Sequence, residues 1–342
     1  MLDIIFLLST IFVLFVLTNH LSKRNIFIDS DIEKKQAIHK KLIPRSGGLA
    51  LFFSITLSIF YNYFYHNDNF LYLLPIIILI FSIGIIDDYG VKLKPLTRFV
   101  ILFVFCFFFL YFSDLKIKTT GLSLIDNLMF KYNLQFLITT ICFLILINGS
   151  NFIDGINGNL ALHYVCLLIL ILLIFSYNRL GLDILILSTI ISFIVFLYFN
   201  FKNRIFFGDG GAYLSGFILG IFILEIMYLE IYISPFFYII LTFYLGSEVL
   251  ISFLRRIIKK ENVMIADFNH LHSLLFTILS KKIKLDPHVS TSLIINFVYV
   301  ILVMPAIFFA DNFELTRYYS LFLYFLYFLI FFSINKIAKN LN

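Results

Sequence analysis

The sequence is poor in charged residues and contains no tryptophan. Only 13% of its 342 residues are Asp, Glu, Lys or Arg, whereas 61% are hydrophobic. A soluble domain has about 25% charged and about 45–50% apolar residues, so these few charges could not cover the surface of a soluble protein of this length. The composition therefore excludes one or two ordinary globular domains, a disordered chain and a nucleic-acid binder with a dense basic patch.

Cysteine is scarce as well. The three cysteines, Cys106, Cys142 and Cys166, all lie within apolar stretches, so no disulfide framework is indicated. The first apolar stretch lacks a preceding basic region and a small-residue cleavage site, which favours a retained helix over a signal peptide.

What the chain does have is long apolar runs, comparable to the roughly 20 residues that a membrane-spanning helix needs. Eleven such runs predict an all-α polytopic membrane protein, with residues 1–342 forming a single integral membrane domain. No internal repeat and no soluble domain is evident. The predicted spans are 2–19, 47–65, 69–87, 95–113, 133–150, 159–177, 181–201, 211–229, 233–254, 288–309 and 316–335.

The basic residues divide unequally between the two sets of connecting segments. Only five of the 26 Lys and Arg residues fall in one set: Lys116, Lys118, Lys131, Arg179 and Arg317. The positive-inside rule places the other set in the cytoplasm, together with the C-terminus, and the N-terminus outside. An even number of spans would disrupt this division, which supports eleven. The predicted cytoplasmic segments are about 20–46, 88–94, 151–158, 202–210, 255–287 and the tail from Lys336.

Five polar clusters all fall on the predicted cytoplasmic side. They are Asp87-Asp88, the run NGSNFIDGING over 148–158, RIFFGDGG over 204–211, DFNHLHS over 267–273 and HKKLIPRSGG over 39–48. Adjacent carboxylates at a membrane boundary repel each other, and a hard divalent cation such as Mg2+ relieves that repulsion. Gly-rich backbone at a helix N-terminus suits an anion, and His can donate to phosphate or exchange a proton near neutral pH.

Each cluster also has a plainer structural interpretation. The Asp pair can cap the next helix, and the two Gly-rich segments can be turns with ordinary capping residues. The Arg and Lys residues before the His pair can form a solvated loop, and a basic stretch at the inner leaflet is first of all a topology signal. Taken jointly, however, the clustered Asp, His, Arg, Lys and Gly residues favour a phosphate ester bound together with Mg2+.

In order and spacing, these motifs resemble those of the polyprenyl-phosphate N-acetylhexosamine-1-phosphate transferases, glycosyltransferase family 4-like enzymes that include phospho-N-acetylmuramoyl-pentapeptide transferase. The resemblance covers about residues 20–290. It implies transfer of GlcNAc-1-phosphate, or a related amino-sugar phosphate, from a UDP-N-acetylhexosamine to undecaprenyl phosphate with release of UMP. It further implies a Mg2+ cofactor, with Mn2+ as the alternative, surrounding membrane lipid, no nucleic acid, and a homodimer as one assembly.

The same resemblance implies a bacterial inner (plasma) membrane enzyme with its active site facing the cytoplasm, which initiates a lipid-linked cell-surface glycan such as the O-antigen of lipopolysaccharide. Because the lipid phosphate is mostly a dianion at neutral pH (second pKa about 6), it needs little help from a base, which favours a single displacement.

The resemblance also implies a role for each site residue. Asp87 engages or deprotonates the lipid phosphate, and Asp209 is the principal metal ligand, with Asp88 beside the metal. Asp154 holds metal or nucleotide, and the histidines contact the diphosphate or the sugar. The implied catalytic residues are Asp87, Asp88, Asp154, His270 and His272, the metal ligands are Asp209, Asp88 and Asp154, and the substrate-binding residues are Asn148, Asn151, Arg98, Lys41, Arg45 and Arg256.

The sequence departs from the family pattern at several positions. Asn157 stands where a second Asp is usual, Ser273 replaces the last His of the His run, and Ala37 replaces a Lys. No acidic residue follows the His run, which favours a surface-glycan enzyme over the peptidoglycan enzyme. Two alternatives are a secondary transporter with membrane-boundary carboxylates, and a membrane phosphatase or lipid-binding homologue that has lost activity. Among carboxylates within predicted spans, Glu248 is interpreted as structural support for the basic loop.

Overall fold

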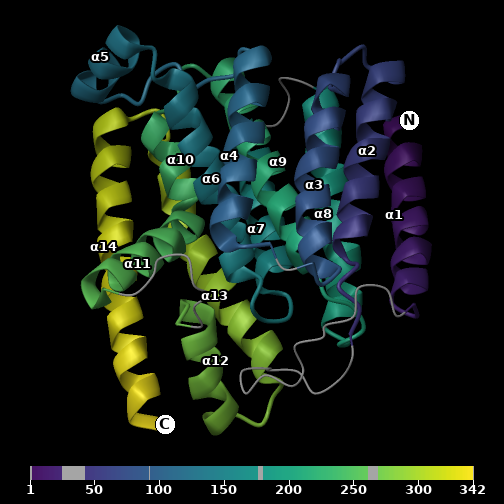
Figure 1. Ribbon diagram of the computed structural model, residues 1–342, viewed down its shortest axis with the longest axis vertical. Helices are drawn as coiled ribbons and strands as arrows, with labels where there is room; N and C mark the ends of the chain where they lie inside the picture. The colour runs from purple at the N-terminus through teal and green to yellow at the C-terminus, as the bar shows by residue number, and fades with distance from the viewer. Residues whose placement is uncertain (1, 25–42, 92, 176–179, 261–268, 342) are drawn as a thin grey trace. The chain divides into compact units, whose positions relative to one another are not determined.

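The computed structural model describes residues 2–24, 43–91, 93–175, 180–260 and 269–341, and helices dominate these ranges (Figure 1). Nine described helices are long and apolar enough to cross a membrane, and a bent helix pair would make a tenth span. The prediction of an all-α polytopic membrane protein is therefore confirmed. The described α-helices are α1 (Leu2–Leu21), α2 (Gly48–Tyr65), α3 (Leu74–Asp88), α4 (Pro95–Phe112), α5 (Ser123–Tyr132), α6 (Gln135–Ile153), α7 (Asn159–Phe175), α8 (Leu180–Asn200), α9 (Gly208–Leu229), α10 (Pro235–Leu241), α11 (Phe243–Lys259), α12 (Leu271–Lys282), α13 (Pro287–Val303) and α14 (Phe313–Leu341).

The predicted span 233–254 is not one straight helix. It consists of α10 and α11, whose axes differ by 76° at Thr242. Along α11 the buried side includes Glu248, Ser252 and Arg256, whereas Leu250 and Phe253 are exposed. Because polar and apolar residues alternate with the helical period on α11, its polar side is buried in protein and its apolar side faces outward.

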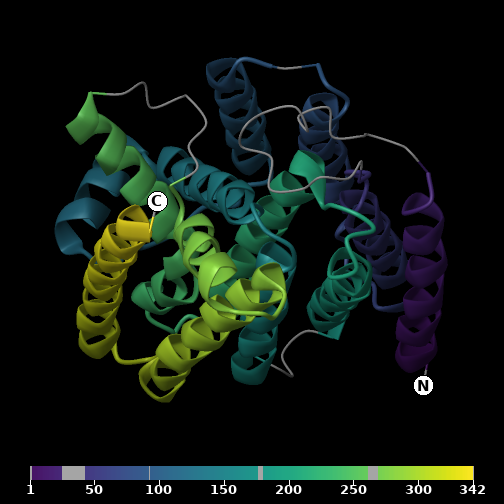
Figure 2. The ribbon, with the colours of Figure 1, turned by 90° about the horizontal axis from the view of Figure 1, so that it is seen from below.

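Two compact units make up the fold. The first contains Met1–Lys94 and Leu160–Ser215, and the second contains Pro95–Asn159 and Gly216–Asn342, so α9 begins in the first unit and ends in the second. In the first unit α8 packs against α1 and α2 (Figures 1 and 2). Ser54 Oγ on α2 donates to the carbonyl oxygen of Ser188 at 2.8 Å, which satisfies a hydroxyl that would be costly to bury unpaired.

The start of α9 lies directly against α3 in the first unit. A Cβ atom added at Gly84 would overlap the backbone of Gly210, and one added at Gly210 would lie 3.2 Å from side-chain atoms of Phe81 and Ile85. Only glycine leaves room for two helix backbones to approach so closely. This contact accounts for the glycine at position 84, whose Cβ would meet the backbone of α9.

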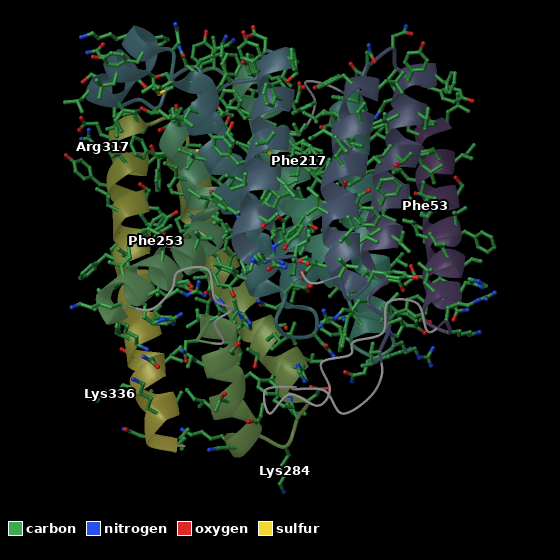
Figure 3. The ribbon with its side chains drawn as sticks, viewed as in Figure 1. Phe53, Phe217, Phe253, Lys284, Arg317 and Lys336 are labelled. Atoms are coloured by element: carbon green, nitrogen blue, oxygen red, sulfur yellow. The ribbon has the colours of Figure 1, made fainter. Side chains whose placement is uncertain are left out.

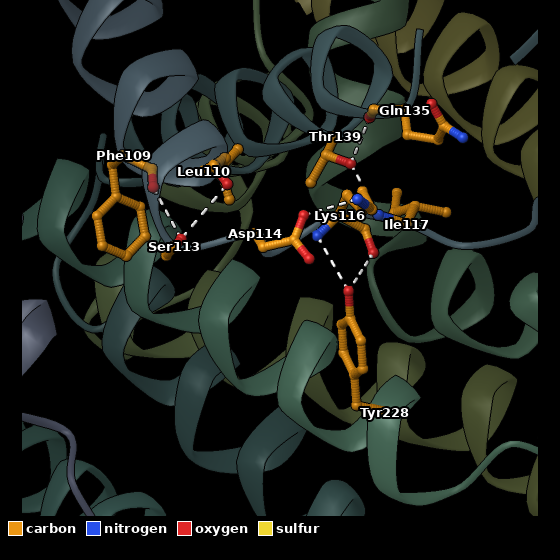
Figure 4. Close-up of polar contacts among 9 residues, drawn as sticks. All are labelled: Phe109, Leu110, Ser113, Asp114, Lys116, Ile117, Gln135, Thr139 and Tyr228. Carbon is orange, nitrogen blue, oxygen red and sulfur yellow. Dashed lines mark hydrogen bonds and ion pairs between the residues drawn. The ribbon is translucent and has the colours of Figure 1, made fainter. Parts of the chain in front are cut away.

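In the second unit α6 packs against α4 and α11, and α14 packs against α10, α11 and α12. The segment after α4 is fastened to α9 by Tyr228, whose hydroxyl accepts from the backbone N–H of Lys116 and donates to its carbonyl oxygen (Figure 4). Lys284 and Lys336 lie toward one end of the unit and Arg317 toward the other end of α14 (Figure 3). The distribution of basic residues in the sequence likewise predicts Arg317 on the opposite side of the membrane from Lys284 and Lys336.

We expect Gly84→Ala to lower the free energy of unfolding by about 1–3 kcal/mol, because its methyl group would meet the Gly210 backbone, which cannot rotate away. Denaturant or thermal unfolding of the full chain in detergent measures this loss. Ser82→Ala is the matched control on α3, since Ser82 is exposed and its hydroxyl bonds only to the carbonyl of Ile78. Equal stability of the two variants would show that the close helix contact is absent.

Candidate active site

Three of the five polar motifs meet in the first unit, at the start of α9. The side chain of Asp88, the last residue of α3, accepts hydrogen bonds from the backbone N–H groups of Asp209 at 3.0 Å and Gly210 at 3.1 Å. These are first-turn N–H groups that have no partner within their own helix. Asp88 therefore caps α9 from a helix about 120 residues earlier in the chain, with only 7% of its surface exposed.

The segment containing Arg45 forms the third part of this group. The backbone N–H groups of Gly47 and Gly48 donate to the carbonyl oxygens of Phe206 and Phe207, both at 2.9 Å. Gly208, the first residue of α9, has φ +82°, and a Cβ atom there would lie 2.6 Å from Asp88 Oδ2. Glycine is the residue that fits this backbone conformation and this space.

The charges around Asp88 are mixed. Asp88 interacts electrostatically with the Asp209 carboxylate, which is unfavourable, and with the Arg45 guanidinium, which is favourable. Asp87, its half-buried neighbour, accepts a hydrogen bond from the backbone N–H of Leu93 at 3.2 Å. Lys41, the remaining predicted residue of this group, lies outside the described residues. The first unit thus gathers three carboxylates, a guanidinium and a helix N-terminus.

The other two motifs meet in the second unit. The helix α6 continues to Ile153, further than the predicted end at 150, so Asn148 and Asn151 lie one turn apart and Asp154 is the C-cap residue. Asn148 Nδ2 donates to the carbonyl oxygen of Leu144 at 2.7 Å, so the side chain runs along its own helix. The first part of the polar run therefore forms the last two turns of α6 and not a loop. The end of a helix tolerates the Gly and Asn residues that this part contains.

The His-containing motif lies beside this end of α6. The His270 ring is 4.9 Å from the Phe152 ring, and the rings of His270 and His272 are parallel with centroids 5.6 Å apart. The Nε2 atom of His272 occupies the space that a side chain on Gly155 would need. Of the two predicted arginines in this unit, Arg98 is half-buried in the first turn of α4, and Arg256 is buried on α11.

A buried carboxylate organises this second group. Glu248 Oε2 lies 2.8 Å from His270 Nδ1, and Glu248 Oε1 accepts from the Leu271 N–H at 3.0 Å and from the Tyr327 hydroxyl at 2.9 Å. Tyr327 comes from α14, a region outside the motifs, and no sequence signal pointed to it. The sequence marked Glu248 as a carboxylate within an apolar stretch and His270 as a candidate catalytic residue, but it did not predict that the two are paired.

Buried polar side chains also fix the segment that follows α6. Asn159 Nδ2 donates to the carbonyl of Ile153 and to the Tyr244 hydroxyl, and Ser292 Oγ donates to the carbonyl oxygen of Asn157 at 2.6 Å. Asn157 itself is buried. The residue that replaces the usual second Asp therefore sits in a packed location, where an uncompensated carboxylate would be costly.

Neither unit, within its described residues, contains a group of three or more His, Cys, Asp or Glu side chains arranged to hold a metal ion. The first unit does supply two neighbouring carboxylates, Asp88 and Asp209, at one helix end.

Comparison with known proteins shows which family the middle of the chain resembles. Residues 70–227 match the profile of glycosyl transferase family 4. A probable undecaprenyl-phosphate N-acetylglucosaminyl 1-phosphate transferase of Bacillus subtilis is 25% identical over 71% of this chain and 68% of its own length. Over the matched residues this chain resembles that family.

Two further relatives have similar names. The undecaprenyl-phosphate alpha-N-acetylglucosaminyl 1-phosphate transferase of Thermotoga maritima is 27% identical over 82% of this chain and 85% of its own length. The phospho-N-acetylmuramoyl-pentapeptide-transferase of Petrotoga mobilis is 30% identical over 53% of this chain and 60% of its own length. The region that matches the family profile contains Asp87, Asp88, Asp154 and Asp209.

We expect Asp88→Ala to lower the free energy of unfolding by about 1–2 kcal/mol, because two buried N–H groups at the start of α9 lose their acceptor. Asp87→Ala is the matched control, since the neighbouring carboxylate accepts from the loop N–H of Leu93 and does not cap α9. The free energies of unfolding of both variants in detergent distinguish the capping of α9 by Asp88 from the loop contact of Asp87. An equal loss of stability in both would contradict the capping of α9 by Asp88.

We expect His272 to make the protein less stable in acid. Burial lowers the pKa of His272 to about 3, with His270 adding to the effect and Glu248 opposing it. An unfolded His has a pKa of about 6.5, so its contribution to stability is complete above about pH 6.5 and decreases as the pH falls toward 3.

Between pH 7.5 and pH 4.5 this one group should remove about 3 kcal/mol of stability in the wild type and none in His272→Gln. The measurement is the difference in unfolding free energy between the two proteins at each pH. Exposed His20→Gln serves as the control and should follow the wild type. A constant difference between wild type and His272→Gln at all pH values would contradict the buried neutral state.

Proposed function

We propose that this protein transfers an N-acetylhexosamine 1-phosphate, GlcNAc-1-phosphate or that of a related amino sugar, from a UDP-sugar to undecaprenyl phosphate. The products are undecaprenyl-diphosphate-linked sugar and UMP. The observation that carries the proposal is the convergence of three separate motifs on the start of α9, around Asp88, Asp209 and Arg45. The names of the Bacillus and Thermotoga relatives supply the lipid acceptor and the sugar phosphate.

The residues at the start of α9 suit a Mg2+ ion. Mg2+ prefers oxygen ligands and is usually bound by one or two carboxylates together with waters and substrate phosphates. Asp209 and Asp88 offer two carboxylates of that kind, and each oxygen of Asp88 retains a lone pair beyond the N–H bond it accepts. When bound, the ion would neutralise diphosphate charge and polarise the leaving phosphate.

The chain's own groups would position the reactants. Arg45 and the positive N-terminal end of the α9 helix dipole would attract phosphate oxygens. Asp87, which is less buried than Asp88, would face the lipid phosphate and take up its remaining proton. An oxygen of that phosphate attacks the phosphorus attached to the sugar, the bond from that phosphorus to the UMP oxygen breaks, and UMP leaves. Asn148, Asn151 and Asp154 would contact the nucleotide side.

The predicted topology completes the proposal. The motifs lie in the set of connecting segments that together carries all but five of the 26 Lys and Arg residues, and the positive-inside rule would put the reaction at the cytoplasmic face of the bacterial plasma membrane. The product would be the first lipid-linked intermediate of a cell-surface glycan. The same basic segments would attract anionic lipid and a nucleotide diphosphate.

The test is UMP release by the purified full chain with undecaprenyl phosphate and a panel of UDP-N-acetylhexosamines, in Mg2+, in Mn2+ and in EDTA. We expect UMP with at least one donor and none in EDTA. Asp209→Asn should lower kcat by at least about 100-fold, because it removes a charged group from the reacting phosphates. Asp114→Asn, a carboxylate paired with Lys116 outside the site, should match the wild type.

Absence of UMP with every donor would overturn the transferase proposal and favour a lipid-binding homologue without activity. Near-normal turnover of Asp209→Asn would overturn its role as the principal metal ligand.

A further inference from the structure

The interaction between Glu248 and His270 joins three helices of the second unit. Glu248 lies on α11, His270 is the N-cap residue of α12, and Tyr327 lies on α14. Only 2% of the Glu248 surface is exposed, and its two oxygens accept three hydrogen bonds in all. A buried carboxylate is stable only when paired and hydrogen-bonded, and this one is both.

The chemistry of a carboxylate fixes the proton on the histidine. An ionised carboxylate can accept hydrogen bonds but cannot donate them, so each of its partners must be a donor. The Leu271 N–H and the Tyr327 hydroxyl already meet Oε1. The third partner, His270 Nδ1, lies 2.8 Å from Oε2 and must therefore carry a proton.

The surroundings of His270 hold the ring in one orientation as well. The Phe152 ring from the end of α6 contacts the His270 ring, and the His272 ring is parallel to it. Because the Leu271 N–H is held by the same carboxylate, the backbone beside His270 cannot rotate independently of Glu248. The ring is thus fixed both in its plane and in its tautomer.

We propose that Glu248 is a positioning residue for the transfer reaction, which holds His270 as the Nδ1–H tautomer and so leaves Nε2 as the nitrogen that meets the substrate. This inference rests on the proposed function, because it assigns His270 to the sugar phosphate substrates. In its neutral form such a histidine accepts a hydrogen bond at Nε2 from an O–H group, borne by the sugar or by a protonated phosphate. Glu248 itself touches no substrate.

The decisive variant is Glu248→Gln, which has nearly the same shape. The Gln carbonyl oxygen can still accept from Leu271 and Tyr327, but its NH2 group is a donor where Oε2 was an acceptor. His270 Nδ1 must then accept, and the ring proton moves to Nε2. We expect kcat to fall by about 10–100-fold, the usual cost of losing the group that orients a functional histidine.

Tyr327→Phe is the matched variant for stability. It removes one hydrogen bond from the same carboxylate but leaves the Glu248–His270 pair intact. We expect it to lower the unfolding temperature at least as much as Glu248→Gln does, with a smaller loss of kcat. If kcat in the two variants instead followed their stability, Glu248 would be a structural residue only.

A double-mutant cycle tests whether Glu248 acts through His270. In a His270→Ala background, Glu248→Gln should cost nothing further in kcat, because the group that it orients is already gone. A cost equal to that in the wild-type background would overturn the proposal. The KM values identify the O–H donor: a rise for the UDP-sugar indicates the sugar hydroxyl, and a rise for undecaprenyl phosphate indicates the phosphate.

A spectroscopic readout does not depend on turnover. In full-length protein with 15N-labelled His rings, the His270 signals are those that His270→Ala removes. We expect protonated Nδ1 in the wild type and protonated Nε2 in Glu248→Gln, and protonated Nε2 in neutral wild-type His270 would overturn the positioning. Wild-type protein with protonated Nδ1 but no UMP release would refute the proposed function and leave the positioning of His270 by Glu248 intact.

Discussion

The first unit depends on one interaction, the acceptance by Asp88 of the first N–H groups of α9. A helix N-terminus buried against other helices has donors that water cannot reach, so an acceptor must come from elsewhere in the chain. Asp88 supplies it across about 120 residues of sequence. The same contact requires glycine at 84 and 208, since larger residues would separate Asp88 and α3 from the helix. Structural and proposed catalytic demands therefore fall on the same residues.

Glu248 solves the same physical problem in the second unit. In a chain with so few charges, each buried carboxylate needs several donors, and Glu248 finds them on two other helices. The bend between α10 and α11 lets α11 bury its polar side while its apolar side faces outward. The carboxylate that holds α12 in place is thereby also the group that orients His270.

The helices and the motifs were predictable from local sequence. Apolar runs of about 20 residues, together with the unequal distribution of Lys and Arg between the two sets of connecting segments, predicted the approximate spans. The clustering of Asp, Asn, Gly and His marked the segments with candidate functional residues. The break at Thr242 and the continuation of α6 to Ile153 were not predicted, because hydropathy is insensitive to a bend within an apolar run and Asn and Gly are ambiguous between a turn and a helix end.

By itself the sequence determined that this is a multi-pass membrane protein whose motifs resemble those of glycosyl transferase family 4, because composition and motif order require no knowledge of contacts. Only the tertiary structure decided that Asp88 caps α9 and that His272 is buried and neutral. It also decided that Glu248 pairs with His270 and accepts a hydrogen bond from Tyr327. Those pairings join residues many positions apart on different helices. They follow from which donors remain unsatisfied after the helices have packed, and no local pattern carries that information.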